Sequence, residues 1–401
     1  MIKDCFPTDR FCNIRTPFYY YNMELLHDTL AVIQREAALH NNYKVHYAVK
    51  ANANPRVLRA IAACGLGADC VSGGEIRAAL DAGFPPQEVV YAGVGKSDWE
   101  IEFAIDRGIA CFNVESEAEL RVIDEIAARK DRVVAVAFRI NPNVEAHTHA
   151  HIVTGMAENK FGIDVDDMEV VFEVAATLKH IQVTGLHFHI GSQILDLDDY
   201  VALCGRINRL QEVLQVKGIF VEHINVGGGL GIDYTAPDEN PMPDFQCYFA
   251  TYAQHLRLHP GQTVHFELGR SVVGQCGSLI SRVLYVKQGR NKRFAILDAG
   301  MTDLIRPALY QAYHRIENLT SQCAESVYDV VGPICESSDV FGKSVSLPQV
   351  NRGDLIAIRS AGAYGEIMAS TYNCRELPGS VFSDDLNPGI STKKRIFRNL
   401  E

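Results

Sequence analysis

The chain has 401 residues, a formal net charge of −11 and no run of basic residues, which argues against nucleic acid and anionic membranes as partners, because both bind through positive charge. It has no stretch of about 18 or more apolar residues and its first residues lack the apolar core of a signal peptide, so we expect no membrane-spanning helix. The 11 cysteines are scattered without a Cys-x-x-Cys pair, which favours reduced thiols and a cytoplasmic location.

Short apolar runs alternate with amphipathic stretches from about residue 44 to about residue 270. Eight of these runs predict strands, near Lys44–Val49, Ala68–Cys70, Val89–Ala92, Ala110–Val114, Val133–Ile140, Gln182–Ile190, Val221–Val226 and Val264–Leu268. Repeated strand and helix units predict a closed parallel (β/α)8 barrel of the TIM type, for which about 250 residues suffice. The alternative is a doubly wound open sheet, which eight evenly spaced units favour less.

Start signals mark the helices between these strands. Asn54 followed by Pro55 is a helix cap with a proline at the first helical position. Three further pairs each predict a capping box, namely Ser72 with Glu75, Ser97 with Glu100, and Ser116 with Glu119.

The pattern changes at about residue 271. Segments rich in β-formers, separated by Gly, Asn and Pro, predict an antiparallel β domain from Ser278–Val286, Arg293–Leu297, Ser326–Val331 and Asp354–Arg359. The apolar segment Pro17–Tyr21 can add a strand to it. We therefore expect a barrel domain of residues 22–270 and a β domain of residues 1–21 and 271–401.

Polar residues gather where the predicted barrel strands end, which is where barrel enzymes place their catalytic groups. They are Lys50, Asp69, Arg139, His187 and His189 with Gly191–Ser192, Gly227–Gly229, and Glu267 with Arg270. A lysine at the inner end of a strand either pairs with a carboxylate such as Asp69 or serves as a Schiff-base lysine. Taken alone, Lys50 fits the first reading better.

The other strand ends suit a flat, phosphorylated cofactor. The glycines at 227–229 leave room for backbone N–H groups to approach a phosphate, although such a triplet usually marks only a turn. Glu267 can pair with a pyridinium nitrogen or, alternatively, with Arg270. His189 can stack on a ring or be a core histidine. His147, His149, His151 and His187 complete no known metal spacing, so we expect no metal.

The same residues carry a resemblance to the fold type III pyridoxal-phosphate (PLP) decarboxylases. It rests on HYAVKANANP, ADCVSGGE, FRINPN, GLHFHIGSQ, NVGGGLGIDY and FELGR and covers nearly the whole chain. It implies PLP as cofactor and Lys50 as the residue that bonds it covalently. It further implies that His189 stacks on the ring and Glu267 pairs with its nitrogen. The remaining implied cofactor contacts are Asp69, Arg139, Ser192, Gly228, Gly229, Gly269, Arg270 and Tyr364.

Three motifs of the β domain are similar to the diaminopimelate-decarboxylase branch of that family, namely RPALY, GPICESSD and AGAYG. The resemblance implies that Arg270, Arg306, Tyr310, Glu336 and Tyr364 bind substrate. It also implies a homodimer in which Cys335 enters the neighbouring subunit's site as the proton donor. The implied reaction removes CO2 from meso-2,6-diaminopimelate and gives L-lysine.

The substrate chemistry fits these residues, because its distal end carries an ammonium and a carboxylate, for which Glu336 and Arg306 supply opposite charges. Two of these residues also have a purely structural explanation. Cys335 can be a small buried hydrophobic residue, as most cysteines are, and Arg306 can pair with Asp303. Leu268 and Glu366 depart from the usual family residues without removing a functional group. The alternatives are a related decarboxylase of carboxynorspermidine or a basic amino acid, or a PLP-binding homologue without catalysis.

Overall fold

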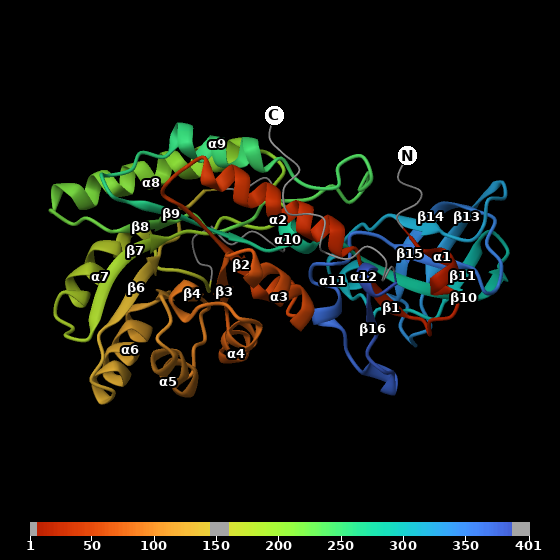
Figure 1. Ribbon diagram of the computed structural model, residues 1–401, viewed down its shortest axis with the longest axis horizontal. Coiled ribbons are helices and arrows are strands. Elements are labelled where there is room, and N and C mark those ends of the chain that lie inside the picture. The colour runs from red at the N-terminus through yellow and green to blue at the C-terminus, as the bar shows by residue number, and fades with distance from the viewer. Residues whose placement is uncertain (1–5, 145–159, 387–401) are drawn as a thin grey trace. The chain divides into compact units, whose positions relative to one another are not determined.

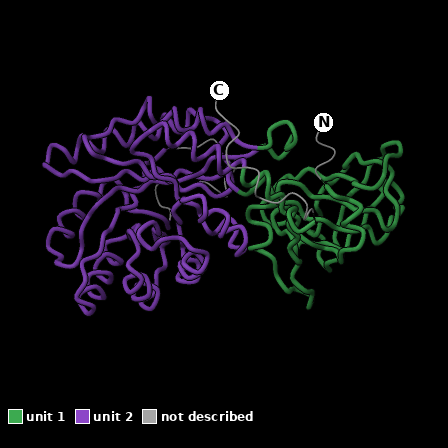
Figure 2. Tube along the Cα trace, viewed as in Figure 1, with its two compact units in different colours: residues 1–27, 233–241, 273–401 green, residues 28–232, 242–272 purple. Residues whose placement is uncertain are grey.

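The computed structural model describes residues 6–144 and 160–386. The chain forms two compact units, coloured separately in Figure 2. The barrel unit comprises residues 28–232 and 242–272, and the sheet unit comprises residues 1–27, 233–241 and 273–401. Residues 22–27 and 233–241, which we expected in the barrel domain, thus group with the sheet unit.

Eight parallel strands close into a ring in the barrel unit (Figure 1). They are β2 (Tyr43–Ala48), β3 (Gly67–Cys70), β4 (Val89–Tyr91), β5 (Cys111–Val114), β6 (Val134–Arg139), β7 (Ile181–His187), β8 (His223–Asn225) and β9 (Thr263–Leu268). Strand β2 pairs with both β3 and β9, which closes the ring and excludes the open sheet. Two ends differ from expectation: Lys50 lies in a short 3-10 turn after β2 (η1, Val49–Ala51), and His189 lies beyond the end of β7.

The connecting helices pack outside this ring (Figure 1). They are α3 (Pro55–Ala63), α4 (Gly73–Ala82), α5 (Asp98–Arg107), α6 (Glu117–Arg129), α7 (Met168–Ala175), α8 (Asp198–Val216) and α9 (Phe245–His255), with α2 (Met23–Ala38) before β2 and α10 (Arg270–Val273) after β9. Asn54 caps α3 as expected.

Only one of the three expected capping boxes is reciprocal, and it is Ser97 with Glu100. Ser72 and Ser116 accept the expected backbone bonds at α4 and α6. Their glutamates, however, accept the backbone N–H groups of Val71 and Glu115 instead of those of the serines. These carboxylates therefore reach back toward the strand ends.

The sheet unit contains an eight-stranded sheet. Its strands are β1 (Phe18–Tyr21), β10 (Gly277–Gln288), β11 (Arg293–Leu297), β12 (Ile316–Asn318), β13 (Glu325–Val331), β14 (Val340–Pro348), β15 (Leu355–Ile358) and β16 (Gly379–Phe382), and its short helices are α1 (Thr8–Phe11), α11 (Arg306–Tyr310) and α12 (Ser383–Leu386). Strand β1 pairs with β10, so the segment near Tyr21 does join this sheet. Pairing is mainly antiparallel, with parallel exceptions between β11 and β13 and between β1 and β16. The pattern did not predict β12, β14 or β16.

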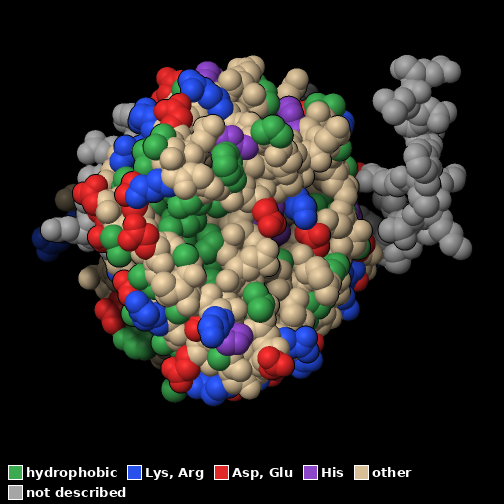
Figure 3. All heavy atoms as spheres, turned by 90° about the vertical axis from the view of Figure 1, so that its left-hand side faces the viewer, with side chains coloured by type: hydrophobic (Ala, Val, Ile, Leu, Met, Phe, Trp, Pro, Cys, Tyr) green, Lys and Arg blue, Asp and Glu red, His purple; other side chains and the backbone are tan. Residues whose placement is uncertain are grey.

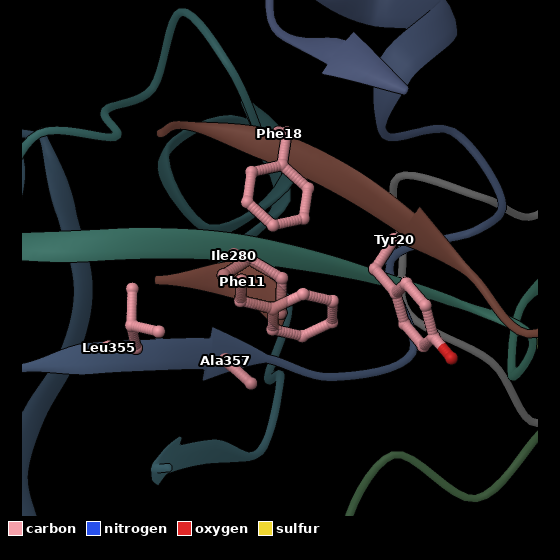
Figure 4. Packing of buried hydrophobic residues seen from close by; sticks show 6 residues of the cluster. All are labelled: Phe11, Phe18, Tyr20, Ile280, Leu355 and Ala357. Atoms are coloured by element: carbon pink, nitrogen blue, oxygen red, sulfur yellow. The ribbon is translucent and has the colours of Figure 1, made fainter. Parts of the chain in front are cut away.

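Aromatic packing fastens the N-terminal segment to this sheet. Phe11, Phe18 and Tyr20 pack with Ile280, Leu355 and Ala357 in one buried cluster (Figure 4). The ring of Phe11 meets those of Phe18 and Tyr20 edge-on at centroid distances of 5.3 and 5.0 Å. Such edge-to-face contacts add to the stability from burial.

Charges of both signs are interspersed on the face of the molecule in Figure 3. No helix among the described residues is long and apolar enough to cross a membrane.

Candidate active site at the barrel rim

Lys50 and Asp69 form an ion pair at the carboxyl ends of β2 and β3. The Lys50 Nζ atom lies 2.6 Å from Asp69 Oδ2. Burial, and then the nearby Glu267 carboxylate, raise the pKa of Asp69, while Lys50 opposes the shift. Asp69 Oδ1 is buried and has no hydrogen-bond partner among the described residues. The Lys50 amine thus lies beside a buried carboxylate whose Oδ1 atom can accept a further hydrogen bond.

Three side chains from three strands hold the buried carboxylate of Glu267 on β9. Its Oε1 atom accepts from Asn225 Nδ2 at 2.7 Å and from Asn113 Nδ2 at 3.1 Å. Its Oε2 atom lies 3.1 Å from His187 Nε2. Burial alone would raise the pKa of Glu267, but the charge and hydrogen bond of His187, with Lys50 and Asn225, hold it below its usual range. The side chains that contact the Glu267 carboxylate among the described residues are therefore Asn113, Asn225 and His187, and Arg270 is not among them.

The glycine turn at residues 227–229 has no space for side chains. Gly227 and Gly229 have φ of +70° and +107°, which glycine adopts most readily. A Cβ atom on Gly228 would lie 1.9 Å from the backbone oxygen of Glu267. The turn thus packs directly against the strand that carries Glu267.

His189 lies next to this turn. The Gly228 N–H donates to His189 Nδ1 at 3.3 Å, so the ring carries its hydrogen on Nε2. Burial, followed by the charges of Arg139 and Lys50, lowers the pKa of His189 to about 3. The ring is therefore neutral near pH 7, which suits a flat stacking surface.

Arg139, at the end of β6, is held in place by Glu115. Its Nη1 atom lies 3.0 Å from Glu115 Oε1, and its guanidinium sits 4.8 Å from the ring centroid of Phe161. Glu115 also accepts the backbone N–H groups of Gly93 and Gly162 at 2.9 and 3.0 Å. Glu115 thus ties together the ends of β4, β5 and β6.

Ser192, which follows β7, and Arg270, which follows β9, contact each other. Arg270 Nη2 donates to Ser192 Oγ at 2.9 Å, and Arg270 is buried. Gly269 precedes it, and a Cβ atom there would come within 3.1 Å of Ala48 Cβ and Ala51 Cβ, on either side of Lys50. Glycine at 269 therefore lets β9 approach the Lys50 turn closely.

Residues 6–144 and 160–386 contain no group of three or more His, Cys, Asp or Glu side chains that could bind a metal ion. His147, His149 and His151 lie outside the described residues.

The remaining candidate residues belong to the sheet unit, where Arg306 sits among aromatic rings. Its guanidinium carbon lies 5.7 Å from the ring centroid of Tyr234 and 5.9 Å from those of Tyr310 and Tyr364. Arg306 is buried on α11. Contacts of this kind between a guanidinium and aromatic rings are attractive and help to hold the Arg306 side chain in place.

Cys335 and Glu336 are exposed on a loop that Asp339 shapes. The Asp339 carboxylate accepts the N–H groups of Met301 at 2.6 Å and Ile334 at 2.7 Å, and burial raises its pKa. Glu336 Oε1 accepts from Tyr372 Oη at 2.7 Å. The loop is thus fixed from within, while its two candidate side chains are exposed.

Tyr364 adopts a backbone conformation that is uncommon for a tyrosine, with φ of +57°. Non-glycine residues held at positive φ gather at functional sites because the surrounding structure must compensate for the strain. Before it, Ala361 and Gly362 donate backbone hydrogen bonds to Gly277, the first residue of β10, and to Gly274, three residues earlier.

Five residues that contact or position candidate side chains escaped the sequence reasoning. They are Asn113, Glu115, Asn225, Tyr234 and Asp339. Asn113, Glu115 and Asn225 lie within or just after expected strands, so their position at strand ends could have identified them as candidates. Nothing in the sequence linked Tyr234 to Arg306 across 72 positions (306 − 234).

Known proteins resemble this chain along most of its length. A family model described as the pyridoxal-binding domain of pyridoxal-dependent decarboxylases matches residues 29–274. A diaminopimelate decarboxylase of Bacteroides thetaiotaomicron is 65% identical over 385 residues, covering 96% of this chain and 100% of that protein.

Solved structures agree with this similarity. The diaminopimelate decarboxylase of Helicobacter pylori complexed with L-lysine has a TM-score of 0.89 and 39% identity, covering 94% of each chain. The M. jannaschii enzyme of that name, also in complex with L-lysine, has a TM-score of 0.85 and 35% identity, covering 94% of this chain and 88% of that one.

Proposed function

The chain belongs to the pyridoxal-dependent decarboxylases, and we propose that it removes CO2 from meso-2,6-diaminopimelate to give L-lysine, with pyridoxal 5'-phosphate as cofactor. The full-length similarity to a relative that bears the name diaminopimelate decarboxylase carries the substrate assignment. The reaction class makes the chain a carboxy-lyase that acts in lysine biosynthesis.

The residues at the barrel rim fit the cofactor. The turn at 227–229 carries no side chains, so a phosphate can approach its backbone closely, and Glu267 is a buried carboxylate whose pKa is lowered. Lys50 supplies an amine beside Asp69. PLP, when bound, supplies a protonated ring that accepts the electron pair left at Cα when CO2 departs.

Each residue then has a proposed role toward that group. Lys50 would bond the cofactor covalently, and the ionised Glu267 would pair with its ring nitrogen. His189, neutral near pH 7, would stack on the ring face. The remaining proposed contacts are Asp69, Arg139, Ser192, Gly228, Gly229, Gly269, Arg270 and Tyr364.

We propose that Arg306 and Glu336 read the distal end of the substrate. The guanidinium of Arg306 can bind the distal carboxylate through two parallel hydrogen bonds, and Glu336 can bind the distal ammonium. Tyr310, Tyr364 and Arg270 complete the proposed substrate contacts. A diamine-forming decarboxylase needs no cation at that position, so Arg306 is the discriminating residue.

We propose that Cys335 donates the proton that replaces CO2 at Cα. In the active homodimer it belongs to the neighbouring subunit, so the sheet unit contributes both to the substrate site and to the dimer interface. The exposure of Cys335 and Glu336 on a single chain supports this arrangement. The sheet unit also exposes large apolar side chains, including Leu309, Tyr313 and Tyr372. The scattered free thiols support a cytoplasmic location.

The testing experiment measures CO2 release by PLP-loaded protein from meso-diaminopimelate, beside L-lysine, L-ornithine, L-arginine and carboxynorspermidine. We expect turnover of diaminopimelate alone, with lysine as product. Turnover of another substrate instead would overturn the roles of Arg306 and Glu336 and keep the cofactor. Binding of PLP without any turnover would point to a non-catalytic homologue.

A further inference from the structure

One buried asparagine joins two parts of the candidate site that the sequence keeps apart. Asn225 is the last residue of β8 and is 1% exposed. Its Nδ2 atom donates to Glu267 Oε1 at 2.7 Å, and its Oδ1 atom accepts the backbone N–H of Gly227 at 2.9 Å. The same amide therefore contacts both the carboxylate and the glycine turn.

The orientation of this amide is fixed by its partners. The backbone nitrogen of Gly227 can only donate, so the oxygen of the Asn225 side chain must face it. The NH2 group must then face Glu267, whose ionised carboxylate can only accept. Neither an aspartate nor an apolar residue can make both contacts.

We propose that Asn225 is a positioning residue that sets the ring-nitrogen anchor, Glu267, and the phosphate-binding turn at 227–229 with one side chain. This inference rests on the proposed function, because it assigns the carboxylate and the turn to two ends of one bound molecule. It goes beyond that function by giving a role to a residue that itself touches neither end.

A neighbouring residue provides a matched control. Asn113 on β5 is equally buried and donates to the same Glu267 oxygen at 3.1 Å. Its Oδ1 atom has no partner among the described residues, so its side chain does not reach the glycine turn. Asn113 and Asn225 therefore share the bond to the carboxylate and differ in the bond to the turn.

The backbone adds a second link that stays unchanged in any side-chain variant. The Glu267 N–H donates to the Gly227 carbonyl at 2.8 Å. This bond aligns the two strands but leaves the Gly227 N–H and the Glu267 carboxylate to be oriented by side chains. Variants at 113 and 225 thus test the side-chain links alone.

The experiment compares the affinity of each protein for PLP with its affinity for pyridoxal, which lacks the phosphate. Wild type, Asn113→Ala, Asn225→Ala and Asn225→Asp are titrated by visible absorbance, with circular dichroism as the check on folding. Because both ligands contain the same ring, the ratio of the two affinities measures how much the phosphate contributes to binding.

We expect Asn113→Ala to weaken both ligands equally and to leave the ratio unchanged. Asn225→Ala should also lower the ratio, by roughly five- to tenfold, the size expected for one lost hydrogen bond. Asn225→Asp keeps an acceptor for Gly227 but places a second carboxylate beside Glu267. It should keep the wild-type ratio, weaken both ligands and shift the pH dependence of the cofactor absorbance.

An unchanged ratio in Asn225→Ala would overturn the inference. If that variant does not fold, Asn225→Asp provides the test. Wild-type affinities with an unshifted pH dependence would count against the proposed double role, and so would a lowered ratio of PLP to pyridoxal affinity. Wild-type protein that binds no PLP would instead defeat the proposed function, so the two failures are distinguishable.

Discussion

A charged carboxylate in the barrel interior is the residue-scale feature on which the site depends. Burial alone would neutralise Glu267, because a low-dielectric surrounding disfavours its ionised form. Asn113, Asn225 and His187 together offset that burial. The carboxylate is thus held ready before any ligand arrives.

Lys50→Ala should abolish the visible absorbance that arises when the cofactor bonds a lysine. The variant removes the amine that would bond the cofactor, and Asp69 stays behind as a carboxyl group whose pKa is raised by burial. Absorbance spectra of PLP-treated protein, with circular dichroism to confirm the fold, make the measurement. Persistence of the band would exclude Lys50 as the bonded residue.

Arg306→Lys should raise KM for diaminopimelate about tenfold or more with a smaller change in kcat. Lysine keeps the positive charge but lacks the planar fork that binds two carboxylate oxygens, and it stacks less well on the three tyrosine rings. Steady-state kinetics separate the two parameters. An unchanged KM would place the distal carboxylate elsewhere.

At the scale of elements, three strands bring histidines together at the amino end of the barrel. His46 of β2 donates through Nδ1 to the Glu88 carbonyl at 3.2 Å, so its Nε2 atom accepts from His265 Nδ1 of β9 at 3.3 Å. The ring of His223 on β8 stacks on that of His265 at a centroid distance of 4.5 Å. A Cβ atom on Gly185 would lie 2.2 Å from His223 Nε2, so glycine on β7 makes room for this ring.

This histidine layer predicts a loss of stability in mild acid. Burial, with the neighbouring His46, His187 and Lys44, lowers the pKa of His223 to about 4, below its ordinary value near 6.5. Between about pH 6.5 and 4 the unfolded chain binds a proton that the folded chain does not, so stability falls as the pH falls, by on the order of 3 kcal/mol for His223.

Melting temperatures measured from pH 7 to pH 4 check this expectation. His223→Gln should flatten the pH dependence, whereas His27→Gln, at an exposed histidine, should leave it unchanged. Equal slopes in the two variants would assign the acid sensitivity to other groups.

At the scale of the whole molecule, the proposed site needs two chains. Lys50 belongs to the barrel unit and Cys335 to the sheet unit. If Cys335 acts in the partner, a mixed dimer of one Lys50→Ala chain and one Cys335→Ala chain retains one site with both residues intact.

Mixing these two inactive variants should therefore restore activity, to about a quarter of the wild-type value if subunits exchange at random. The measurement is CO2 release before and after exchange, with exchange itself demonstrated by tagged subunits. No recovery after demonstrated exchange would show that each site is built from one chain.

Sequence patterns predicted the parts of the fold that repeat. The apolar runs marked all eight barrel strands, and strand ends such as those near Lys50 and Glu267 could be placed together because a closed barrel brings them to one rim. Less was predictable in the sheet unit, where β14 has exposed residues and no continuous apolar run. Its pairing with β13 provides the support that its own sequence lacks.

The sequence alone was enough to predict the barrel, the candidate lysine and the candidate carboxylate, because hydrophobic periodicity and the ends of strands depend on residues that are close together in the chain. Only the tertiary structure decided how Glu267 stays ionised, since its partners Asn225, His187 and Asn113 lie 42, 80 and 154 positions away. It likewise placed Tyr234 beside Arg306. Hydrogen bonds and cation–ring contacts act over a few ångströms in space, and no sequence spacing specifies which distant residues will come that close.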